Sequence, residues 1–361
     1  MDVARRSERL RAGLETAGCD ALLVTHLTNI RYLTGFTGSA ALLVVDGDGL
    51  LLVTDGRYDE QAHDELADAG VAARIEIGRS GEVQRELVAS RLVGTPRVGL
   101  ESEHVSWADQ RRYADSWFPG AALVPVAGSV EALRIVKDPG EVARIETACG
   151  IADAALAAVR PLLDDGPTET AFALALETEI RRRGADDISF ETIVASGPNG
   201  SRPHHTPSDR AIVRGDLVVI DFGALVDGYH SDMTRTVPVG GLDALDDTQR
   251  RMVAVVTEAQ AAGVAAVRAG GSTKDVDGAC RSLIAAAGWG DAFVHGTGHG
   301  VGLDIHEDPR VSWAVDATLA DGQVVTVEPG VYLPGHGGVR VEDTVVVTST
   351  GCRPLTRAPK S

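Results

Sequence analysis

The chain has 361 residues, more than one hydrophobic core usually organises, so two domains are expected. Hydrophobic residues make up 44% of it and charged residues 24%, a composition typical of globular proteins rather than disordered ones. The net charge of −18 repels phosphate backbones and anionic lipid surfaces, so we expect neither nucleic acid nor a membrane as a partner.

The cysteines and the amino-terminal residues bear on the compartment. The four cysteines lack the spacings of metal fingers or redox pairs, which is typical of a reduced environment. Residues 1–14 alternate charged residues with Leu and Ala and lack the apolar run of a signal peptide. We therefore expect a cytoplasmic protein.

The first third of the chain predicts an α/β unit over residues 1–128. A charged helix is expected near 3–17, followed by strands at 21–25, 40–45 and 50–54. Asp46-Gly47-Asp48-Gly49 between the last two strands is typical of a hairpin turn. Further strands and helices alternate up to residue 126.

The pattern changes near residues 127–129, where we expect the domain boundary, with a second domain over 129–361. A long helical register begins there and is interrupted at Pro139, where Asp138 and Glu141 favour a new helix start. Later in this domain, apolar runs separated by glycine-rich turns predict strands, interleaved with alanine-rich helices. Most unusual polar residues lie at the ends of these strands.

Two aspartates follow the apolar run 217–220. Asp221 ends this run, and Asp232 comes eleven residues later, with the hairpin signal Asp227-Gly228 between them. Two strands joined by such a turn can bring both carboxylates together. Taken alone, an aspartate at a strand end is more often a turn or cap residue than a ligand.

Two glutamates follow a similar pattern. Glu328 ends the run 324–327, and Glu342 lies among valines fourteen residues later. A buried carboxylate needs a cation or a metal ion, because an isolated charge in an apolar interior is too costly. Arg340 offers a salt bridge as the alternative to metal.

Between these pairs lies a glycine-rich stretch with three histidines, His295, His299 and His306, close to Asp304 and Glu307. Glycine lets the backbone approach a ligand closely. A lone histidine in a loop is usually structural, but this clustering with carboxylates favours a functional site.

The five residues make sense together as a metal cage. Four carboxylates that converge without a counter-charge would repel one another, whereas two divalent cations neutralise them. Oxygen ligands with one imidazole suit manganese, which we expect first, or cobalt, zinc or iron. Two such ions activate water and polarise a carbonyl, as in aminopeptidases. The cage is Asp221, Asp232, His299, Glu328 and Glu342.

These residues, in this order, resemble the pita-bread metallopeptidases, the family of methionine aminopeptidase, aminopeptidase P and prolidase. The resemblance covers nearly the whole chain. It implies that Asp232 and Glu342 bridge the two metals, that Asp221 completes one site, and that His299 and Glu328 complete the other. It also implies that Glu328 shuttles a proton during catalysis.

The same resemblance implies the residues that contact substrate. His204 lies seventeen residues before Asp221, as the family's substrate-binding histidine does, so His204 is expected to fill this role, with the adjacent His205 as the alternative. His295 and His306 match further catalytic histidines that bind the carbonyl oxygen. Arg340 is expected to contact substrate or support the cage.

The amino-terminal third resembles the creatinase-type domain of proline-specific members. The matching segments are Asn29–Phe36 and Thr54–Tyr58. Methionine aminopeptidases lack this domain, and creatinase lacks the metal ligands that are present here. The expected fold class is an α/β creatinase-like amino-terminal domain followed by an α+β pita-bread catalytic domain.

The expected function is hydrolysis of the bond between an amino-terminal residue and a following proline. We predict an Xaa-Pro aminopeptidase acting on peptides with proline at the second position. The alternative is an Xaa-Pro dipeptidase, or prolidase, restricted to dipeptides. A catalytically silent pita-bread module is a further alternative, disfavoured because all five ligands are present. The resemblance also implies a homodimer.

Overall fold

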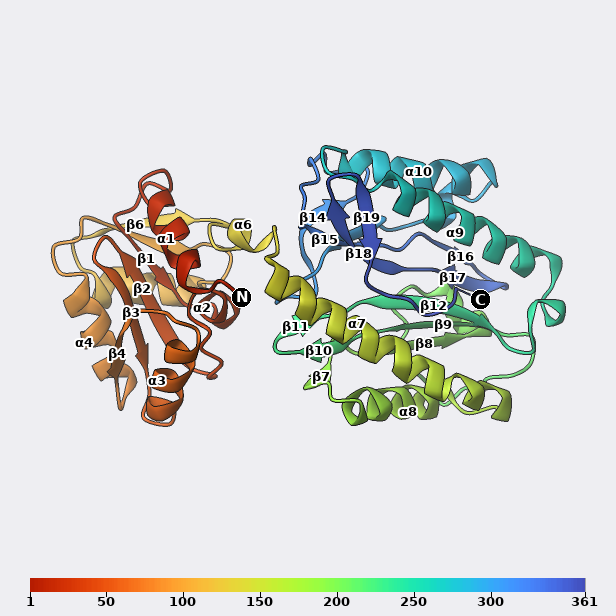
Figure 1. Ribbon diagram of the computed structural model, residues 1–361, viewed down its shortest axis with the longest axis horizontal. Helices are drawn as coiled ribbons and strands as arrows, with labels where there is room; N and C mark the ends of the chain where they lie inside the picture. The colour runs from red at the N-terminus through yellow and green to blue at the C-terminus, as the bar shows by residue number, and fades with distance from the viewer. Residues whose placement is uncertain (361) are drawn as a thin grey trace. The chain divides into compact units, whose positions relative to one another are not determined.

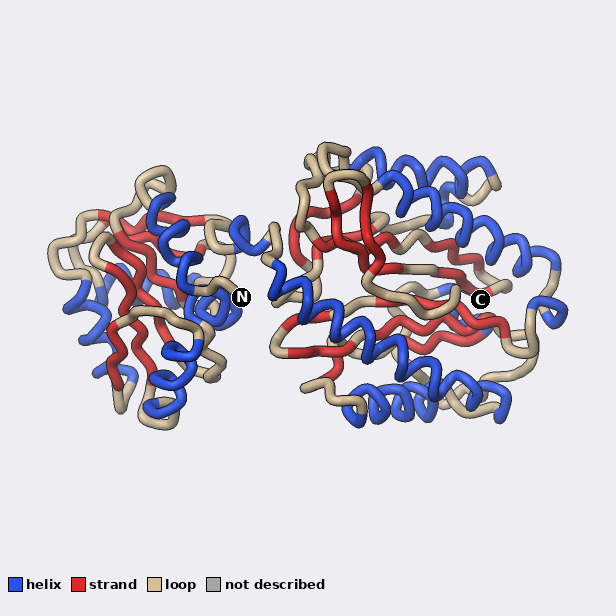
Figure 2. Tube along the Cα trace, viewed as in Figure 1, coloured by secondary structure: helices blue, strands red, loops and turns tan. Residues whose placement is uncertain are grey.

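The computed structural model describes residues 1–360, and their contacts divide the chain into two compact units, Met1–Arg134 and a second that begins at Ile135 (Figures 1 and 2). The boundary expected between residues 128 and 129 falls shortly before this division, and it stays a prediction.

Unit 1 contains one six-stranded mixed sheet in the order β4-β3-β2-β1-β5-β6. The central β1 pairs antiparallel with β2 and parallel with β5. The strands are β1 (Ala21–Val24), β2 (Ala41–Asp46), β3 (Gly49–Thr54), β4 (Arg74–Ile77), β5 (Arg97–Glu101) and β6 (Ala122–Val126). The helices are α1 (Ala4–Gly13), α2 (Leu27–Thr34), α3 (Asp59–Asp68), α4 (Gly81–Arg91), α5 (Trp107–Arg112) and α6 (Glu131–Arg134).

The hairpin predicted in this unit is confirmed. Asp46 pairs with Gly49 at the ends of β2 and β3, and the Asp46 Oδ1 accepts the backbone N–H of Asp48 at 2.8 Å. Gly49 has φ 133°, a conformation that disfavours other residues. Helix α5 ends at Arg112, and the next five residues, Tyr113–Trp117, form a π-helical turn.

Unit 2 contains two pairs of long helices and several antiparallel sheets. The helices are α7 (Pro139–Val159), α8 (Glu169–Arg182), α9 (Asp247–Ala266) and α10 (Thr273–Ala286). The strands are β7 (Asp187–Ile188), β8 (Ile193–Ser196), β9 (Leu217–Phe222), β10 (Ala224–Val226), β11 (Tyr229–His230), β12 (Met233–Pro238), β13 (Gly298–Gly300), β14 (Glu307–Val311), β15 (Val324–Val327), β16 (Gly330–Leu333), β17 (Gly337–Arg340), β18 (Asp343–Thr348) and β19 (Gly351–Pro354).

The helix start expected at Pro139 is confirmed by a capping box. Asp138 Oδ1 accepts the backbone N–H of Glu141 at 2.9 Å, and Glu141 Oε2 accepts the backbone N–H of Asp138 at 2.9 Å. Such reciprocal bonds satisfy two N–H groups that the helix leaves unpaired.

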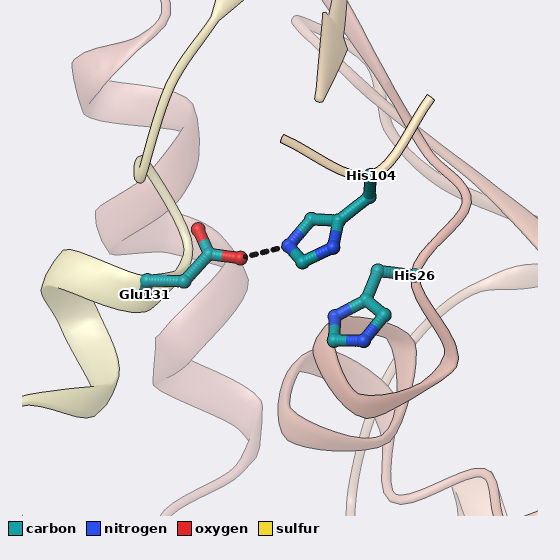
Figure 3. Close-up of side chains that lie close together, drawn as sticks. All are labelled: His26, His104 and Glu131. Carbon is teal, nitrogen blue, oxygen red and sulfur yellow. Dashed lines mark hydrogen bonds and ion pairs between the residues drawn. The ribbon is translucent and has the colours of Figure 1, made fainter. Parts of the chain in front are cut away.

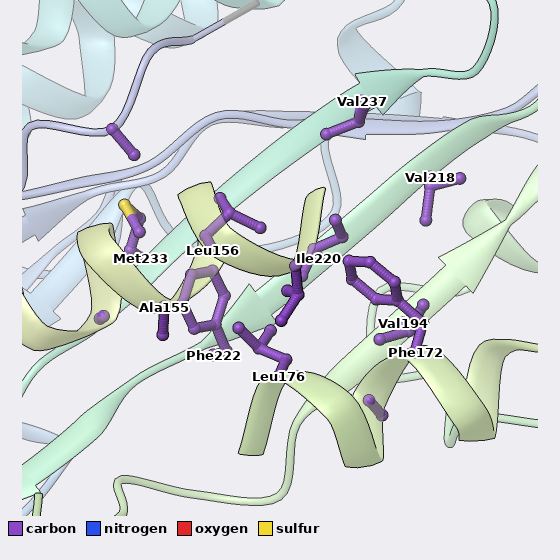
Figure 4. Close-up of a cluster of buried hydrophobic side chains, with 14 of the residues drawn as sticks. Ala155, Leu156, Phe172, Leu176, Val194, Val218, Ile220, Phe222, Met233 and Val237 are labelled. Carbon is purple, nitrogen blue, oxygen red and sulfur yellow. The ribbon is translucent and has the colours of Figure 1, made fainter. Parts of the chain in front are cut away.

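Each helix pair covers its own set of strands (Figure 1). One core joins α7 and α8 to the sheet β12-β9-β8, and Figure 4 shows Phe172 and Leu176 of α8 packed beside Ile220 and Phe222 of β9. A second core joins α9 and α10 to strands that include β15, β17 and β18. The continuous apolar runs in β9 and β15 are buried because both of their faces are covered.

Candidate metal centre and substrate pocket

The two aspartates are brought together by a ladder between β9 and β12. Asp221 lies in β9 with Thr234 as its partner in β12, and Asp232 comes directly before β12. The connection turns at Asp227 and Gly228, whose φ angles of 47° and 75° are those of a tight hairpin turn. The hairpin predicted at these residues is confirmed by the pairing of β10 with β11.

The two glutamates flank a second ladder. Glu328 follows β15 and Glu342 precedes β18, and these strands pair so that Val327 lies opposite Asp343. The Glu342 backbone N–H donates to the Thr234 carbonyl at 3.1 Å, which joins this ladder to the aspartate-bearing strands. The two ladders therefore deliver four carboxylates to one region.

His299 joins them from β13. Its Nδ1–H donates to the carbonyl of the following residue at 3.0 Å, which leaves Nε2 as a lone-pair donor. Nε2 lies 3.5 Å from Asp232 Oδ2 and 3.4 Å from Glu328 Oε1. The neighbouring Gly298 permits this approach, since a Cβ there would lie 2.0 Å from the Thr326 carbonyl oxygen.

The geometry and the chemistry of this cluster fit a metal centre. Ligand atoms of Asp232, His299 and Glu342 all lie within 4.8 Å of one another, and all three residues are buried. Among the described residues, the buried oxygens Asp221 Oδ1 and Glu342 Oε1 have no hydrogen-bond partner. Buried orphan oxygens next to an imidazole lone pair are what divalent cations satisfy.

The protein itself supplies too little positive charge for these carboxylates. Burial, and then the neighbouring carboxylates, raise the pKa of Asp232 and of Glu342 well above their usual range. Arg340 is the buried cation beside them, and its Nη2 lies 2.6 Å from Asp221 Oδ2. The salt bridge of Arg340 thus goes to Asp221 rather than to either glutamate. One guanidinium cannot neutralise four carboxylates.

The predicted site residues all line one cavity of about 390 Å³. They are His204, Asp221, Asp232, His295, His299, His306, Glu328, Arg340 and Glu342. Phe190, Ile193 and Ile305 add apolar surface to the lining. The cavity therefore combines the charged cluster with a surface that suits an apolar group.

The adjacent histidines His204 and His205 have different surroundings. His204 is exposed and lines the cavity, whereas His205 Nε2 donates to Glu169 Oε2 at 2.9 Å. Glu169 is fully buried and also accepts the backbone N–H groups of Ser196 and Ser208 at 2.7 and 3.0 Å. His205 therefore ties the loop that presents His204 to a buried carboxylate.

His295 has both ring nitrogens engaged. Its Nδ1–H donates to the Gly296 carbonyl at 2.8 Å, and its Nε2 accepts the hydroxyl of Tyr332 at 2.8 Å. The Tyr332 oxygen in turn accepts Nη1–H of Arg340 at 2.8 Å. Burial lowers the pKa of His295, so it is neutral. The chain of contacts from His295 through Tyr332 and Arg340 ends at Asp221.

His306 lies beside the cage histidine, with ring centroids of His306 and His299 4.4 Å apart. Partial burial of the ring, and then its neighbours His299 and Arg310, lower the pKa of His306. A neutral imidazole keeps one N–H donor and one acceptor. His306 can therefore donate a hydrogen bond into the cavity at neutral pH.

Two lining or supporting residues were missed by the sequence analysis. Arg310 lines the cavity from β14 and is exposed. It could have been noticed as the cation that closes the acidic segment Glu307-Asp308-Pro309-Arg310. Tyr332 links two predicted site residues, but a tyrosine in a short apolar strand is ordinarily a packing residue, so its role carried no sequence signal.

Both units match models of known protein families. The model of "Metallopeptidase family M24" matches residues 143–349, and that of "Creatinase/Prolidase N-terminal domain" matches residues 6–136. The first match covers more than half of the chain. The chain belongs to metallopeptidase family M24. The M24 model spans all five residues of the expected metal cage.

Individual relatives of this M24 protein match along nearly its full length. An Xaa-Pro dipeptidase of Pyrococcus horikoshii is 42% identical over 345 residues, 94% of this chain and 93% of the relative. The structure of an Xaa-Pro dipeptidase from Bacillus anthracis superposes with a TM-score of 0.93 at 36% identity, and it covers 99% of both chains. That of an X-Pro aminopeptidase from Thermotoga maritima gives 0.89 at 35% identity and the same coverage.

The expected fold class is confirmed: a creatinase-type amino-terminal domain precedes a pita-bread catalytic domain. The M24 protein is a metal-dependent peptidase, as expected. Within residues 1–360, none of the helices combines the length and the apolar character needed to cross a bilayer.

Proposed function

We propose that this M24 peptidase hydrolyses the bond between an amino-terminal residue and a following proline, with Xaa-Pro dipeptides as its preferred substrates. The observation that carries this proposal is a single cavity lined by the five-residue cage, three further histidines and an exposed arginine. The dipeptide preference was the alternative in the sequence analysis. The names of the B. anthracis and P. horikoshii proteins support it over the aminopeptidase.

Asp221, Asp232, His299, Glu328 and Glu342 would hold two divalent cations, with manganese as the first to test. Bound there, such ions supply Lewis-acid polarisation of the scissile carbonyl and lower the pKa of water. Arg340 and Thr234 orient two of these ligands: Arg340 binds Asp221, and the Thr234 hydroxyl donates to Glu342 Oε2 at 2.7 Å. Fixed carboxylates can bind ions without reorganising.

Glu328 is the ligand suited to moving a proton. Its side chain is 18% exposed, against 7% for that of Asp232, so it reaches the cavity more openly. The nitrogen of proline in the scissile amide has no N–H, and it must receive a proton as the bond breaks. Glu328 would take the proton from the attacking water and deliver it to this nitrogen.

The histidines would bind the oxygen of the scissile carbonyl. His306 is neutral and keeps an N–H donor, which can stabilise the negative charge that develops on this oxygen. His204 lines the same cavity and would bind the substrate beside it. Because His295 bonds Tyr332, we propose that it holds Tyr332 and Arg340 in place for Asp221.

Arg310 supports the dipeptide preference. In an Xaa-Pro dipeptide the proline carries a free carboxylate, whereas in a longer peptide it carries a neutral amide. Among the described residues, Arg310 has no carboxylate within ion-pair distance, so its guanidinium can attract that carboxylate. A longer substrate would lose this charge interaction.

The test compares an Xaa-Pro dipeptide with the matching Xaa-Pro-Yaa tripeptide, using metal-free protein with manganese, cobalt or zinc added back. We expect faster hydrolysis of the dipeptide, and a raised KM for the dipeptide alone in Arg310→Met. Equal or faster cleavage of the tripeptide would favour the aminopeptidase. Hydrolysis of neither peptide, with no bound metal, would identify a catalytically silent module.

A further inference from the structure

A second cluster of metal-binding side chains lies in unit 1 (Figure 3). His26 comes from the turn between β1 and α2, His104 from the segment between β5 and α5, and Glu131 from α6. One ligand atom from each residue lies within 4.8 Å of the other two, the same separation that the catalytic cluster meets. Nothing in the peptidase function uses these residues.

The carboxylate and one imidazole are already in contact. His104 Nε2 donates to Glu131 Oε1 at 2.8 Å, and both side chains are partly exposed. The rings of His26 and His104 are stacked, with centroids 3.8 Å apart and planes 7° apart. Two imidazoles and one carboxylate form the donor set of many zinc sites, which leave a fourth position for water.

Buried residues beneath the cluster hold it in place. Asn29 Nδ2 donates to Glu131 Oε1 at 2.6 Å, and its Oδ1 accepts from Arg134 at 2.8 Å. The buried Glu101 accepts the backbone N–H of His26 at 2.9 Å, which fixes the chain at that residue. Metal ligands are commonly oriented by hydrogen bonds of this kind.

A hydrogen-bond network also joins the cluster to a second carboxylate. Asn29 Nδ2 donates to Glu101 Oε1 at 2.7 Å as well as to Glu131, so one neutral amide joins two acidic side chains.

We propose that His26, His104 and Glu131 bind one divalent transition-metal ion, with Zn²⁺ as the reference ion, separate from the catalytic metals. The metal replaces the proton shared by His104 and Glu131. Because the ring planes are nearly parallel, at least one ring must turn about χ2 before both nitrogens face one ion. Torsions of this kind are soft, and neither ring is part of the apolar core.

The experiment counts zinc on the full-length chain. Protein stripped by chelator is dialysed against Zn²⁺, and bound zinc per chain is measured for wild type, His26→Gln, His104→Gln and Glu131→Gln. His63→Gln is the matched control, because His63 is an exposed histidine of the same unit. We expect wild type and His63→Gln to bind one zinc more than the His26 and His104 variants, whose affinity falls by about 100-fold or more.

A second measurement reads the ligands directly. In the variant Asp232→Asn/Glu342→Gln, added Cu²⁺ should give an electron paramagnetic resonance spectrum with coupling to two imidazole nitrogens. Adding His104→Gln to this variant should remove the coupling to one of these two nitrogens. This result does not depend on the proposed peptidase function, because the cage is disabled. Manganese-supported peptidase activity should stay unchanged in His104→Gln.

The proposal fails if wild type, His26→Gln and His104→Gln bind the same amount of zinc. It also fails if His63→Gln loses as much bound zinc as the His26 and His104 variants do. Thermal unfolding shows whether each variant is folded. Should His104→Gln unfold, His26→Gln and the copper spectrum decide the question. A folded His26→Gln with undiminished zinc and an unchanged spectrum would leave His104 and Glu131 as an ordinary hydrogen-bonded pair.

Discussion

Two buried acidic regions of the catalytic domain differ in how their charge is satisfied. Glu169 is completely buried, yet Ser196, Asn199, His205 and Ser208 all donate hydrogen bonds to it. Burial alone would raise its pKa, but these bonds lower the pKa from 4.5 to about 2. In the cage, burial and mutual repulsion raise the pKa of Asp232 and Glu342 instead.

The difference distinguishes a structural anchor, as we call Glu169, from the carboxylates of the cage, which are the proposed metal ligands. Burial is common to both regions, so it cannot identify a metal site by itself. Donors surround Glu169, whereas one oxygen of Glu342 and one of Asp221 lack any partner among the described residues. Glu169 is satisfied by donors of the chain itself, whereas the unpaired oxygens of the cage are the ones that the proposed metal ions would satisfy.

The largest expected effect is in the cage. Glu342→Gln should lose bound metal and lower kcat/KM by about 10³-fold or more, because the metal ions contribute several kcal/mol to transition-state stabilisation. The metal-free variant should unfold at the same or higher urea concentration than metal-free wild type, since a repelled charge has been removed. Metal analysis, peptide hydrolysis and urea titration measure the three quantities.

Glu258→Gln, on the exposed side of α9, is the control for that variant and should change none of the three. A clearly less stable metal-free Glu342→Gln would show that Glu342 acts as a structural anchor. The contrast with Glu169 would then disappear.

The anchor should give the opposite result. Glu169→Gln should lower the free energy of unfolding by about 3 kcal/mol at pH 7, because a pKa unit corresponds to about 1.4 kcal/mol and the pKa falls from 4.5 to about 2. Its metal content should be unchanged. Glu177→Gln, on the same helix, controls for the loss of charge. A loss below about 0.5 kcal/mol, the size of ordinary surface substitutions, would contradict the anchor role.

The adjacent histidines test the same contrast with smaller effects. His204→Gln should lower kcat/KM by about 10²-fold with little change in stability, as loss of one transition-state contact does. His205→Gln should lower the free energy of unfolding by about 2 kcal/mol, because it removes a hydrogen bond to a buried charge. Measurements of kcat/KM and of urea unfolding on both variants separate the substrate-binding role from the structural role. If His205→Gln lost activity and His204→Gln lost stability, the two roles would be exchanged.

The sequence predicted a feature correctly where the spacing of residues and their chemical type indicate the same structure. Asp227-Gly228 and Asp46 to Gly49 predicted their hairpins, because few residues suit positive φ angles. Charge balance then grouped residues as far apart as Asp221 and Glu342, and the structure brings their strands together. The M24 family and its fold followed from the order of those residues.

Other features depend on contacts that no local pattern encodes. Asp343 follows Glu342 and is equally buried, but it pairs with Arg235 at 2.8 Å and Lys360 at 2.8 Å. The sequence Glu342-Asp343 does not reveal which carboxylate meets a cation of the chain. Likewise, Glu169 begins an ordinary amphipathic helix, and its bond to His205 depends on tertiary packing.

The smallest effect is a change of stability with pH, and its sign follows from Glu169. Since its folded-state pKa of about 2 is below 4.5, its stabilisation is fully present above pH 4.5 and is lost as pH falls towards 2. The difference in unfolding free energy between wild type and Glu169→Gln should therefore shrink from about 3 kcal/mol at pH 7 to about 1.5 kcal/mol at pH 3. Urea titrations of both chains between pH 7 and pH 3 measure this difference. The carboxylates of the cage are the same in both chains, so their own pH dependence cancels in the difference. A constant difference would mean that hydrogen bonds rather than the charge of Glu169 hold the His204 loop.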